Sequence, residues 1–349
     1  MEAMGKALMQ ELDWKMMAAQ EPVSTVYFGG GTPSLFDLDQ LERLVSRCLA
    51  TGAHPSEITL EANPEDITDE RLKAWLAMGI TRLSIGVQTF DDDRLRWMNR
   101  AHSGQQATDA ILNAHALGFQ HLSADLIYGL PDRKTPFAED LDKACGLPVD
   151  HLSAYILTVE DQTALGRNVQ KGLESVAPES LVEAEYALLC SRAKEAGFDH
   201  YEVSNFARPG GHAQHNQHYW TGQPFLGIGP GAHGFDGHQR LANVSNNPRY
   251  LAAVEKAQNL DELPVERDVL SAHDRYNEGL MTGLRTAKGI DVEALENEYG
   301  HHPQTEDPDF WKRCIADRTL EPLAGSRYRI REEKWLVADR IASAFFVVE

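Results

Sequence analysis

The chain has 349 residues, 42% of them hydrophobic and 25% charged, which is ordinary for a soluble globular protein with one large domain and a smaller one. Acidic residues outnumber basic ones by 53 to 33, and the net charge of −20 argues against nucleic acid and anionic membranes as partners. Because no apolar run approaches the roughly 18 residues of a membrane helix, we expect neither an integral membrane segment nor a signal peptide.

The four cysteines do not form a recognisable metal-binding or disulfide pattern. Cys48, Cys145, Cys190 and Cys314 lie far apart, and no two have the spacing of metal ligands. Free thiols in a reduced, cytoplasmic protein are the expected outcome.

From Thr25 to about Leu157, after an opening helix predicted over Ala3–Ala19, short apolar runs alternate with helical patterns, as in βα units that build a parallel sheet. The predicted strands are Thr25–Phe28, Glu57–Ala62, Arg82–Gly86, Leu122–Leu126 and Leu152–Leu157, and the helices between them include Asp39–Ala50, Thr68–Met78 and Gln105–Leu117. Glycines at 79, 118 and 197 follow helical patterns, where glycine adopts the left-handed conformation that ends a helix.

The later part of the chain differs in composition and periodicity. Ala207–Asn247 is rich in Gly, His, Asn and Pro with little periodicity, which predicts a long, ordered, functional loop. From about Val265 the pattern predicts a small winged-helix-like α+β domain that closes with a strand at Ser326–Arg331 and a helix at Glu333–Phe346. We therefore predict an α/β fold with a partial βα barrel in residues 1–206, a His/Gly-rich loop region and linker in 207–264, and the small domain in 265–349.

A glycine run follows the first predicted strand. Gly29, Gly30, Gly31 and Thr32 let a ligand approach the backbone closely and offer N–H groups to a carboxylate or phosphate. The run lacks both the lysine of a P-loop and the spacing of a dinucleotide-binding loop. Taken alone, it is either a binding loop or a tight structural turn.

Polar side chains end the later strands. These are Glu61, Asn63, Gln88 and Asp125. In a parallel βα barrel such strand ends meet at one mouth, where active sites lie. The alternative is that each one caps the following helix or satisfies loop backbone.

Five motifs together resemble the radical S-adenosylmethionine (SAM) coproporphyrinogen oxidase-like family, in the same order and at the same spacings. They are Gly29 to Ser34, Glu61-x-Asn63-Pro64, Gly86 to Phe90, Arg100-x-His102 and Asp125 to Pro131. The resemblance extends from about residue 5 to the end of the chain. It implies a partial barrel of six strands, of which five are recognised here.

The resemblance also implies a SAM site. By position, the backbone at Gly30, Gly31 and Thr32 would hold the methionine end of SAM, and Glu61 would accept hydrogen bonds from the ribose hydroxyls. Arg100 would pair with the SAM carboxylate, while Gln88 and Asp125 would complete the nucleoside contacts. An ordinary surface ion pair for Arg100 and a helix cap for Gln88 are the alternatives. No catalytic residue is assigned.

Two further segments are similar to the haem-chaperone branch of this family. One is His215-Asn-Gln-His-Tyr-Trp220, and the other is the glycine-rich run Gly227 to His233; Tyr201 to Phe206 also matches. The resemblance implies a protein that binds haem and hands it to an unknown acceptor protein, with His215 as an axial ligand to the haem iron between aromatic walls. The alternative for His215 is that it orders the long loop by hydrogen bonding, and the alternative activity is that of an oxygen-independent coproporphyrinogen III oxidase.

The family's 4Fe–4S cluster is held by a Cys-x-x-x-Cys-x-x-Cys motif after the first strand, and this motif does not occur in the chain. We expect the motif and the sixth strand to lie upstream of Met1, which would leave Thr25–Phe28 at an exposed sheet edge; the alternative is a cluster-free remnant that only binds a ligand or partner. SAM and haem are thus the expected cofactors, with the cluster only where the missing cysteines are restored. Radical cleavage of SAM is not expected of the chain as it stands.

Overall fold

The computed structural model describes residues 2–19, 22–50, 54–131 and 135–348. The chain folds into two compact units. We call one the barrel unit, which contains Tyr27–Leu35 and Ile58–Ala213, and the other the terminal unit, which contains Met1–Val26, Phe36–Glu57 and Gln214–Glu349. Each unit is assembled from separated stretches of the chain. The division at 1–206, 207–264 and 265–349, which follows chain order, stays a prediction.

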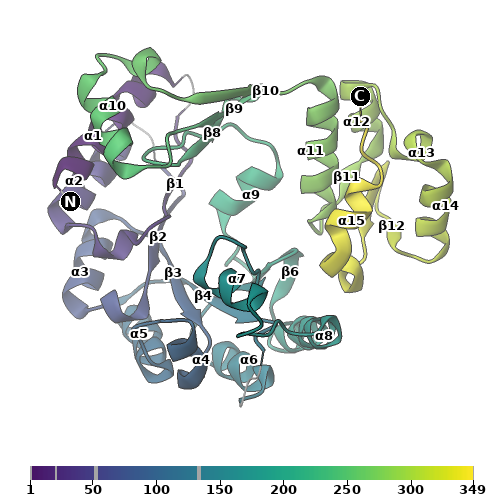
Figure 1. The fold of residues 1–349 in the computed structure, drawn as a ribbon, viewed down its shortest axis with the longest axis horizontal. Coiled ribbons are helices and arrows are strands. Elements are labelled where there is room, and N and C mark those ends of the chain that lie inside the picture. The colour runs from purple at the N-terminus through teal and green to yellow at the C-terminus, as the bar shows by residue number, and fades with distance from the viewer. Residues whose placement is uncertain (1, 20–21, 51–53, 132–134, 349) are drawn as a thin grey trace. The chain divides into compact units, whose positions relative to one another are not determined.

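A seven-stranded sheet forms the core of the barrel unit, with strand order β1-β2-β3-β4-β5-β7-β6 (Figure 1). Its strands are β1 Thr25–Phe28, β2 Glu57–Ala62, β3 Arg82–Gln88, β4 His121–Tyr128, β5 His151–Ile156, β6 Asp199–Glu202 and β7 Asn205–Ala207. Strands β2 to β5 pair in parallel, whereas β7 is antiparallel to both β5 and β6. The five predicted strands are confirmed, β1 lies at an edge of the sheet as expected, and the β6–β7 hairpin is an addition that the apolar pattern did not predict.

Helices lie around this sheet (Figure 1), and predicted glycines end two of them. The helices are α3 Asp69–Met78, α4 Asp92–Trp97, α5 Gly104–Leu117, α6 Phe137–Gly146, α7 Ala164–Gln170 and α8 Glu179–Glu195, with single turns η1 Pro33–Leu35 and η2 Pro64–Asp66. Gly79 and Gly118 have φ of 91° and 113°, in the left-handed region that ends α3 and α5. At the other end of α5, Ser103 and Gln106 form a reciprocal capping box.

The register of the parallel strands places polar side chains in rows. Glu61 lies beside Ser84, which lies beside Ser123, and Asp125 lies beside Ser153. Side chains alternate between the two faces of a strand, so the intervening residues form the opposite face. Those residues include Leu60, Leu83, Ile85, Leu122 and Ala124, all of them buried. The sheet therefore has an apolar face that forms the core and a polar face that carries the predicted site residues.

The terminal unit contains residues 214–247 of the segment that was predicted to be an ordered loop, and these residues form helix α9 Gln214–Trp220 and strands β8 His233–Phe235 and β9 Gln239–Ala242. Strand β10 Glu266–Val269 completes a three-stranded antiparallel sheet with them. The unit also contains helices α1 Glu2–Ala18, α2 Leu38–Leu49 and α10 Asn247–Lys256 and the turn η3 Leu260–Glu262. Ala7 on α1 packs with Tyr250 and Val254 on α10 and with Leu263 in an apolar cluster. These strands escaped prediction because they are short and mostly polar.

A buried ion pair anchors the glycine-rich run to α1. Glu11 and Lys15 are 2.7 Å apart, one turn from each other on that helix. The Glu11 carboxylate also accepts hydrogen bonds from the Gly229 N–H at 2.8 Å, from Asn243 Nδ2 at 2.7 Å and from the Tyr250 hydroxyl at 2.6 Å. Every carboxylate oxygen is thus satisfied, which a buried charge requires.

The C-terminal part of the terminal unit combines helices with a small sheet of order β11-β13-β12, as predicted for an α+β domain. Its elements are α11 Ala272–Leu284, β11 Ile290–Asp291, α12 Val292–Tyr299, α13 Pro303–Glu306, α14 Pro308–Ala316, β12 Leu320–Pro322, β13 Arg327–Ile330, η4 Glu332–Val337 and α15 Ala338–Ser343. The predicted final helix over Glu333–Phe346 is wrong in its first half. There the chain forms a 3-10 segment, in which the buried Trp335 donates its indole N–H to the Ile330 carbonyl at 2.9 Å.

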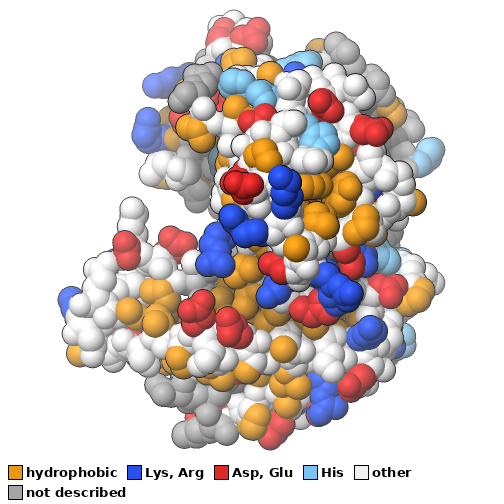
Figure 2. Space-filling view, turned by 90° about the vertical axis from the view of Figure 1, so that its right-hand side faces the viewer, with side chains coloured by type: hydrophobic (Ala, Val, Ile, Leu, Met, Phe, Trp, Pro, Cys, Tyr) orange, Lys and Arg blue, Asp and Glu red, His pale blue; other side chains and the backbone are white. Residues whose placement is uncertain are grey.

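The surface bears charges of both signs. On the face displayed in Figure 2, several basic side chains gather across the middle, with acidic side chains beside them. Over the described part of the chain, no helix is both long and apolar enough to span a membrane.

Candidate functional site

The glycine run and Glu61 lie together at the carboxyl end of the parallel strands. Gly30 and Gly31 have φ of 74° and 64°, a conformation that glycine adopts without strain. The Gly30 N–H donates to one Glu61 carboxylate oxygen at 3.1 Å, and the Tyr27 hydroxyl donates to the other at 2.8 Å. A Cβ atom on either Gly30 or Gly31 would meet nothing within 4 Å, so the loop borders open space next to the carboxylate. Thr32 follows in the same exposed loop.

Tyr27 is a contact that the sequence pattern did not single out. Burial and the nearby Glu61 carboxylate raise its pKa far above the ordinary value, so the phenol stays protonated and acts as a donor. In the sequence this residue reads as an ordinary apolar strand residue. Its position two residues before the glycine run was the only available signal.

Arg100 lies beside Asn63 and Gln88 around a glycine. Its Nη2 donates to Asn63 Oδ1 at 2.7 Å and to the Gly86 carbonyl at 3.2 Å. Its Nε atom is buried and has no hydrogen-bond partner among the described residues. A Cβ atom on Gly86 would lie 3.1 Å from both Arg100 Nη2 and Gln88 Nε2, so glycine leaves room for this arrangement. A buried guanidinium N–H with no acceptor is suited to an anionic ligand.

Gln88 has an unusual backbone. Its φ of 66° lies in the left-handed region, which a residue other than glycine seldom adopts, and the pairing of β3 with β4 shifts register between Ile85 and Gln88. Strain of this kind clusters at ligand-binding positions. The bulge turns the Gln88 side chain toward Gly86 instead of along the regular strand.

His102, in the same motif as Arg100, is a supporting residue. It is buried, and its two ring nitrogens lie 3.0 Å from a Glu65 carboxylate oxygen and 3.1 Å from the Val87 carbonyl. Both nitrogens are therefore used in holding η2 against the end of β3.

Asp125 is surrounded by hydroxyl groups on the polar face of the sheet. Ser84 Oγ donates to both of its carboxylate oxygens, at 3.0 and 3.1 Å, and Ser123 Oγ donates at 3.3 Å. Burial, with a smaller contribution from the Glu61 charge, raises the pKa of Asp125 to about 7, although the hydrogen bonds from the serine hydroxyls lower it. The carboxyl group thus changes charge near neutral pH.

His215 lies in the terminal unit, on α9, with a hydroxyl group at each ring nitrogen. Nδ1 is 2.8 Å from Thr25 Oγ1, and Nε2 is 3.0 Å from the Tyr219 hydroxyl. The Glu57 carboxylate accepts the backbone N–H groups of Gln214 and His215, and so fixes the start of the helix. Burial lowers the pKa of His215 to about 4, so the imidazole is neutral at physiological pH.

Aromatic rings continue from His215 in an edge-to-face series. The Tyr219 ring lies 5.1 Å from the imidazole at 87°, and the Phe225 ring lies 4.8 Å from Tyr219 at 90°. Phe235 follows at 6.4 Å from Phe225. Tyr219 and Leu226 remain more than two-fifths exposed, so part of this apolar surface is open to solvent.

The neighbouring histidines have other surroundings. His218 Nδ1 lies 3.4 Å from Thr25 Oγ1 and thus shares that hydroxyl with His215. His233 is exposed on β8. His212 belongs to the barrel unit, where its ring packs 4.7 Å from that of Tyr201. The structure therefore brings one of these three histidines to His215.

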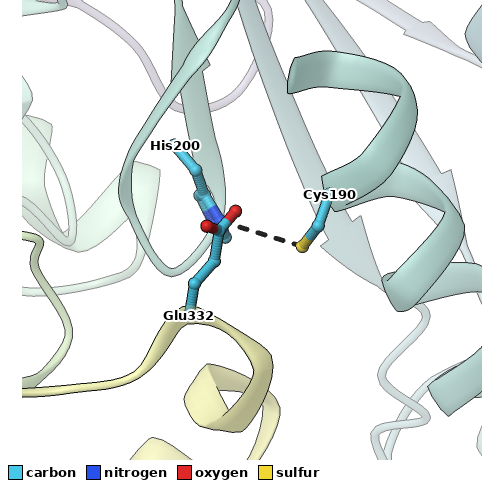
Figure 3. A group of neighbouring side chains, drawn as sticks. All are labelled: Cys190, His200 and Glu332. Atoms are coloured by element: carbon cyan, nitrogen blue, oxygen red, sulfur yellow. Dashed lines mark hydrogen bonds between the residues drawn. The ribbon is translucent and has the colours of Figure 1, made fainter. Parts of the chain in front are cut away.

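The four cysteines do not form a cluster site. None of them forms a disulfide, and they lie on four different helices, α2, α6, α8 and α14. Burial raises the pKa of Cys48 and of Cys314 to about 11 and also raises that of Cys145, which disfavours the thiolate that an iron–sulfur cluster needs. Cys190 Sγ lies 3.8 Å from His200 Nδ1 (Figure 3).

Comparisons with known families match both ends of the chain. Residues 8–144 match the radical SAM superfamily, and residues 270–326 match the HemN C-terminal domain. Among solved structures, the coproporphyrinogen III oxidase HemN from Escherichia coli superimposes with a TM-score of 0.81 over 98% of this chain and 82% of that one. At 22% sequence identity this similarity shows the fold alone.

Curated relatives extend the match over nearly the whole chain. A protein of Bacillus subtilis named heme chaperone HemW is 31% identical over 97% of this chain and 90% of its own length. A Mycobacterium tuberculosis protein of the same name is 37% identical over 83% of this chain and 74% of its own. A Bos taurus protein named radical S-adenosyl methionine domain-containing protein 1, mitochondrial, is 37% identical over 89% of this chain and 68% of its own length.

Proposed function

This chain belongs to the HemW family of radical SAM proteins, and we propose on that premise that it is a haem chaperone, which binds haem and passes it to an acceptor protein. The observation that carries the proposal is the neutral imidazole of His215 beside partly exposed aromatic and apolar side chains. The relatives named heme chaperone support the same reading. The acceptor is unidentified, and the four cysteines, which form no disulfide, favour a reducing compartment such as the cytoplasm.

We assign haem ligation to His215. Iron takes a lone pair from a neutral imidazole, and the lowered pKa keeps this ring neutral above about pH 5. Tyr219, Phe225 and Leu226 offer apolar surface of the kind that covers a porphyrin face. Because Thr25 holds the opposite ring nitrogen, the imidazole is already oriented before haem arrives.

We assign SAM binding to the barrel unit, and the residues there fit that ligand. The open glycine loop at Gly30, Gly31 and Thr32 would receive the amino-acid end, and the buried Nε of Arg100 would meet its carboxylate. Glu61 and Asp125 are carboxylate acceptors suited to ribose hydroxyls, and Gln88 adds an amide. When bound, SAM would supply a sulfonium cation and an adenosyl group.

The cysteines of this chain do not fit a 4Fe–4S cluster. They lie on separate helices, and burial favours the protonated form of three of them. We therefore derive no radical step from these residues. Binding and orientation of haem and SAM are the roles that the chain's own side chains support.

The test compares haem transfer with porphyrinogen oxidation. The protein is loaded with haem and mixed with apomyoglobin as a general haem acceptor, and transfer is followed by absorbance. In parallel, a version of the protein with the cysteine segment restored is incubated with SAM, a reductant and coproporphyrinogen III. Haem transfer that is lost in His215→Ala supports the chaperone assignment, whereas formation of protoporphyrinogen would favour the oxidase activity instead.

A further inference from the structure

Each ring nitrogen of His215 has a hydroxyl group within hydrogen-bond distance. Thr25 Oγ1 lies 2.8 Å from Nδ1, and the Tyr219 hydroxyl lies 3.0 Å from Nε2. A neutral imidazole has one N–H and one lone pair, so one hydroxyl accepts from the ring and the other donates to it. The hydroxyl that donates covers the lone pair that an iron atom would need.

The surrounding hydrogen bonds are compatible with an arrangement in which Tyr219 is the donor. Thr25 Oγ1 is also within 3.4 Å of His218 Nδ1. If Tyr219 donates to Nε2 of His215, the Nδ1–H of that ring donates to Thr25, and the threonine hydroxyl proton is left for His218. Each proton then has an acceptor, and the lone pair that faces the exposed aromatic surface is the one on Nε2.

The two hydroxyls differ in their freedom to move. Thr25 is 9% exposed and lies in β1, where the backbone holds it in place. Tyr219 is 43% exposed and is four residues after His215 on α9, so its phenol reaches the imidazole from the next helical turn. Rotation of the tyrosine side chain would exchange the hydrogen bond to Nε2 for one to water.

We propose that Tyr219 is a latch that covers Nε2 of His215 when haem is absent, and that Thr25 holds Nδ1 so that iron binds Nε2 once the phenol turns away. This proposal rests on the assignment of His215 as the haem ligand. It gives the tyrosine a role in release as well as in binding, because a phenol that returns to Nε2 competes with iron. Such competition lowers the affinity for haem, which suits a protein that transfers haem to an acceptor.

Removing only the phenolic hydroxyl tests the latch. Tyr219→Phe keeps the ring against Phe225 and frees Nε2, so haem should bind more tightly, by roughly twofold to tenfold, the equivalent of one hydrogen bond. Haem transfer to apomyoglobin should slow correspondingly. Tyr299→Phe, which removes a hydroxyl from α12, is the matched control and should leave haem affinity unchanged.

The role of Thr25 has a separate readout. Thr25→Val keeps the shape of the side chain but leaves the Nδ1–H without its acceptor, so less of the bound haem should show the low-spin spectrum of a histidine complex. Thr25→Ser restores the hydroxyl and should restore the spectrum. If Thr25 only maintained the fold, the low-spin spectrum would not depend on whether residue 25 carries a hydroxyl group.

The tautomer of His215 can be read in the absence of haem by ¹⁵N NMR. The latch requires a protonated Nδ1 and an unprotonated Nε2, and a proton on Nε2 would overturn it whatever the haem affinity. Weaker haem binding by Tyr219→Phe would also overturn it, since it would mean that the phenol contributes to haem binding instead of opposing it. Equal haem affinity of the parent and His215→Ala would instead refute the assignment of His215 as the haem ligand. The phenol of Tyr219 would then not compete with iron either.

Discussion

The Tyr27 hydroxyl donates to the Glu61 carboxylate at 2.8 Å, from a strand position two residues before the glycine run. The second carboxylate oxygen accepts the Gly30 N–H at 3.1 Å. One carboxylate is thereby fixed between a side chain of β1 and the loop that follows this strand. This arrangement preorganises Glu61 to accept hydrogen bonds from a ligand.

Removal of the tyrosine hydroxyl should loosen Glu61 and weaken SAM binding. We expect Tyr27→Phe to raise the dissociation constant for SAM about threefold to tenfold, the equivalent of one typical hydrogen bond, because the tyrosine acts on SAM only through Glu61. Glu61→Ala should have a larger effect, because it removes the proposed ribose acceptor itself. Isothermal titration calorimetry measures both, and identical SAM affinity in Tyr27→Phe and the parent would show that the tyrosine does not position the carboxylate.

Arg100 provides a test of the amino-acid end of the SAM site. Arg100→Lys keeps the positive charge but removes Nε, which is buried without an acceptor in the described structure. We expect SAM affinity to fall by a factor of about ten or more, because an ammonium group cannot reproduce the guanidinium geometry. Arg96→Lys, at an exposed position on α4, is the control and should bind SAM as the parent does. Full affinity in Arg100→Lys would remove this residue from the proposed site.

SAM affinity should depend on pH through Asp125. Its pKa is raised to about 7, and only the carboxylate form can accept a hydrogen bond from a ribose hydroxyl at both oxygens. Affinity should therefore increase as the pH rises through 7, and Asp125→Asn should abolish this dependence. Glu61 and the phenols of Tyr27 and Tyr155 also face this region, and the raised pKa values of the two phenols keep them protonated in the same range. A pH profile that is unchanged in Asp125→Asn would assign the titration to another group.

The buried pair on α1 should contribute strongly to stability. Glu11→Ala leaves the Lys15 ammonium group buried without its counter-ion and removes the acceptor of Gly229, Asn243 and Tyr250. We expect the free energy of unfolding to fall by about 3–5 kcal/mol, measured by urea denaturation. Glu2→Ala breaks an exposed pair with Lys6 on the same helix and should have no measurable effect. Similar stability of the two variants would contradict the anchoring role of Glu11.

Sequence patterns predicted the strand bounds and helix ends that are determined by residues close together in the chain. The bounds of β1 and β2 were predicted because turn residues flank their apolar runs, and Gly79 and Gly118 were recognised as helix ends from their position alone. The β6–β7 hairpin was missed because its strands are short and polar. The proposed site shows the same division: Glu61 stands out at a strand end, whereas its partner Tyr27 looks like a core residue.

Contacts between residues that lie far apart in the sequence could not be predicted from local sequence patterns. Thr25 and His215 are 190 residues apart in the sequence, yet their side chains form the hydrogen bond that orients the imidazole. The glycine-rich run from Gly227 to His233 lies in the segment that was predicted to be a functional loop. In the structure, the Gly229 N–H donates to Glu11, which is 218 residues away.

Haem titration of His215→Ala, followed through the Soret band, tests the central claim most directly. The account predicts that this variant loses the Soret shift seen with the parent, and that Glu61→Ala, altered in the proposed SAM site, and His233→Ala, altered on the exposed strand β8, both keep it. Because the pKa of His215 is about 4, the shift in the parent should be constant from about pH 6 to 8 and decline as the pH approaches 4. A His215→Ala variant that binds haem with the affinity and spectrum of the parent would contradict the assignment of the haem ligand.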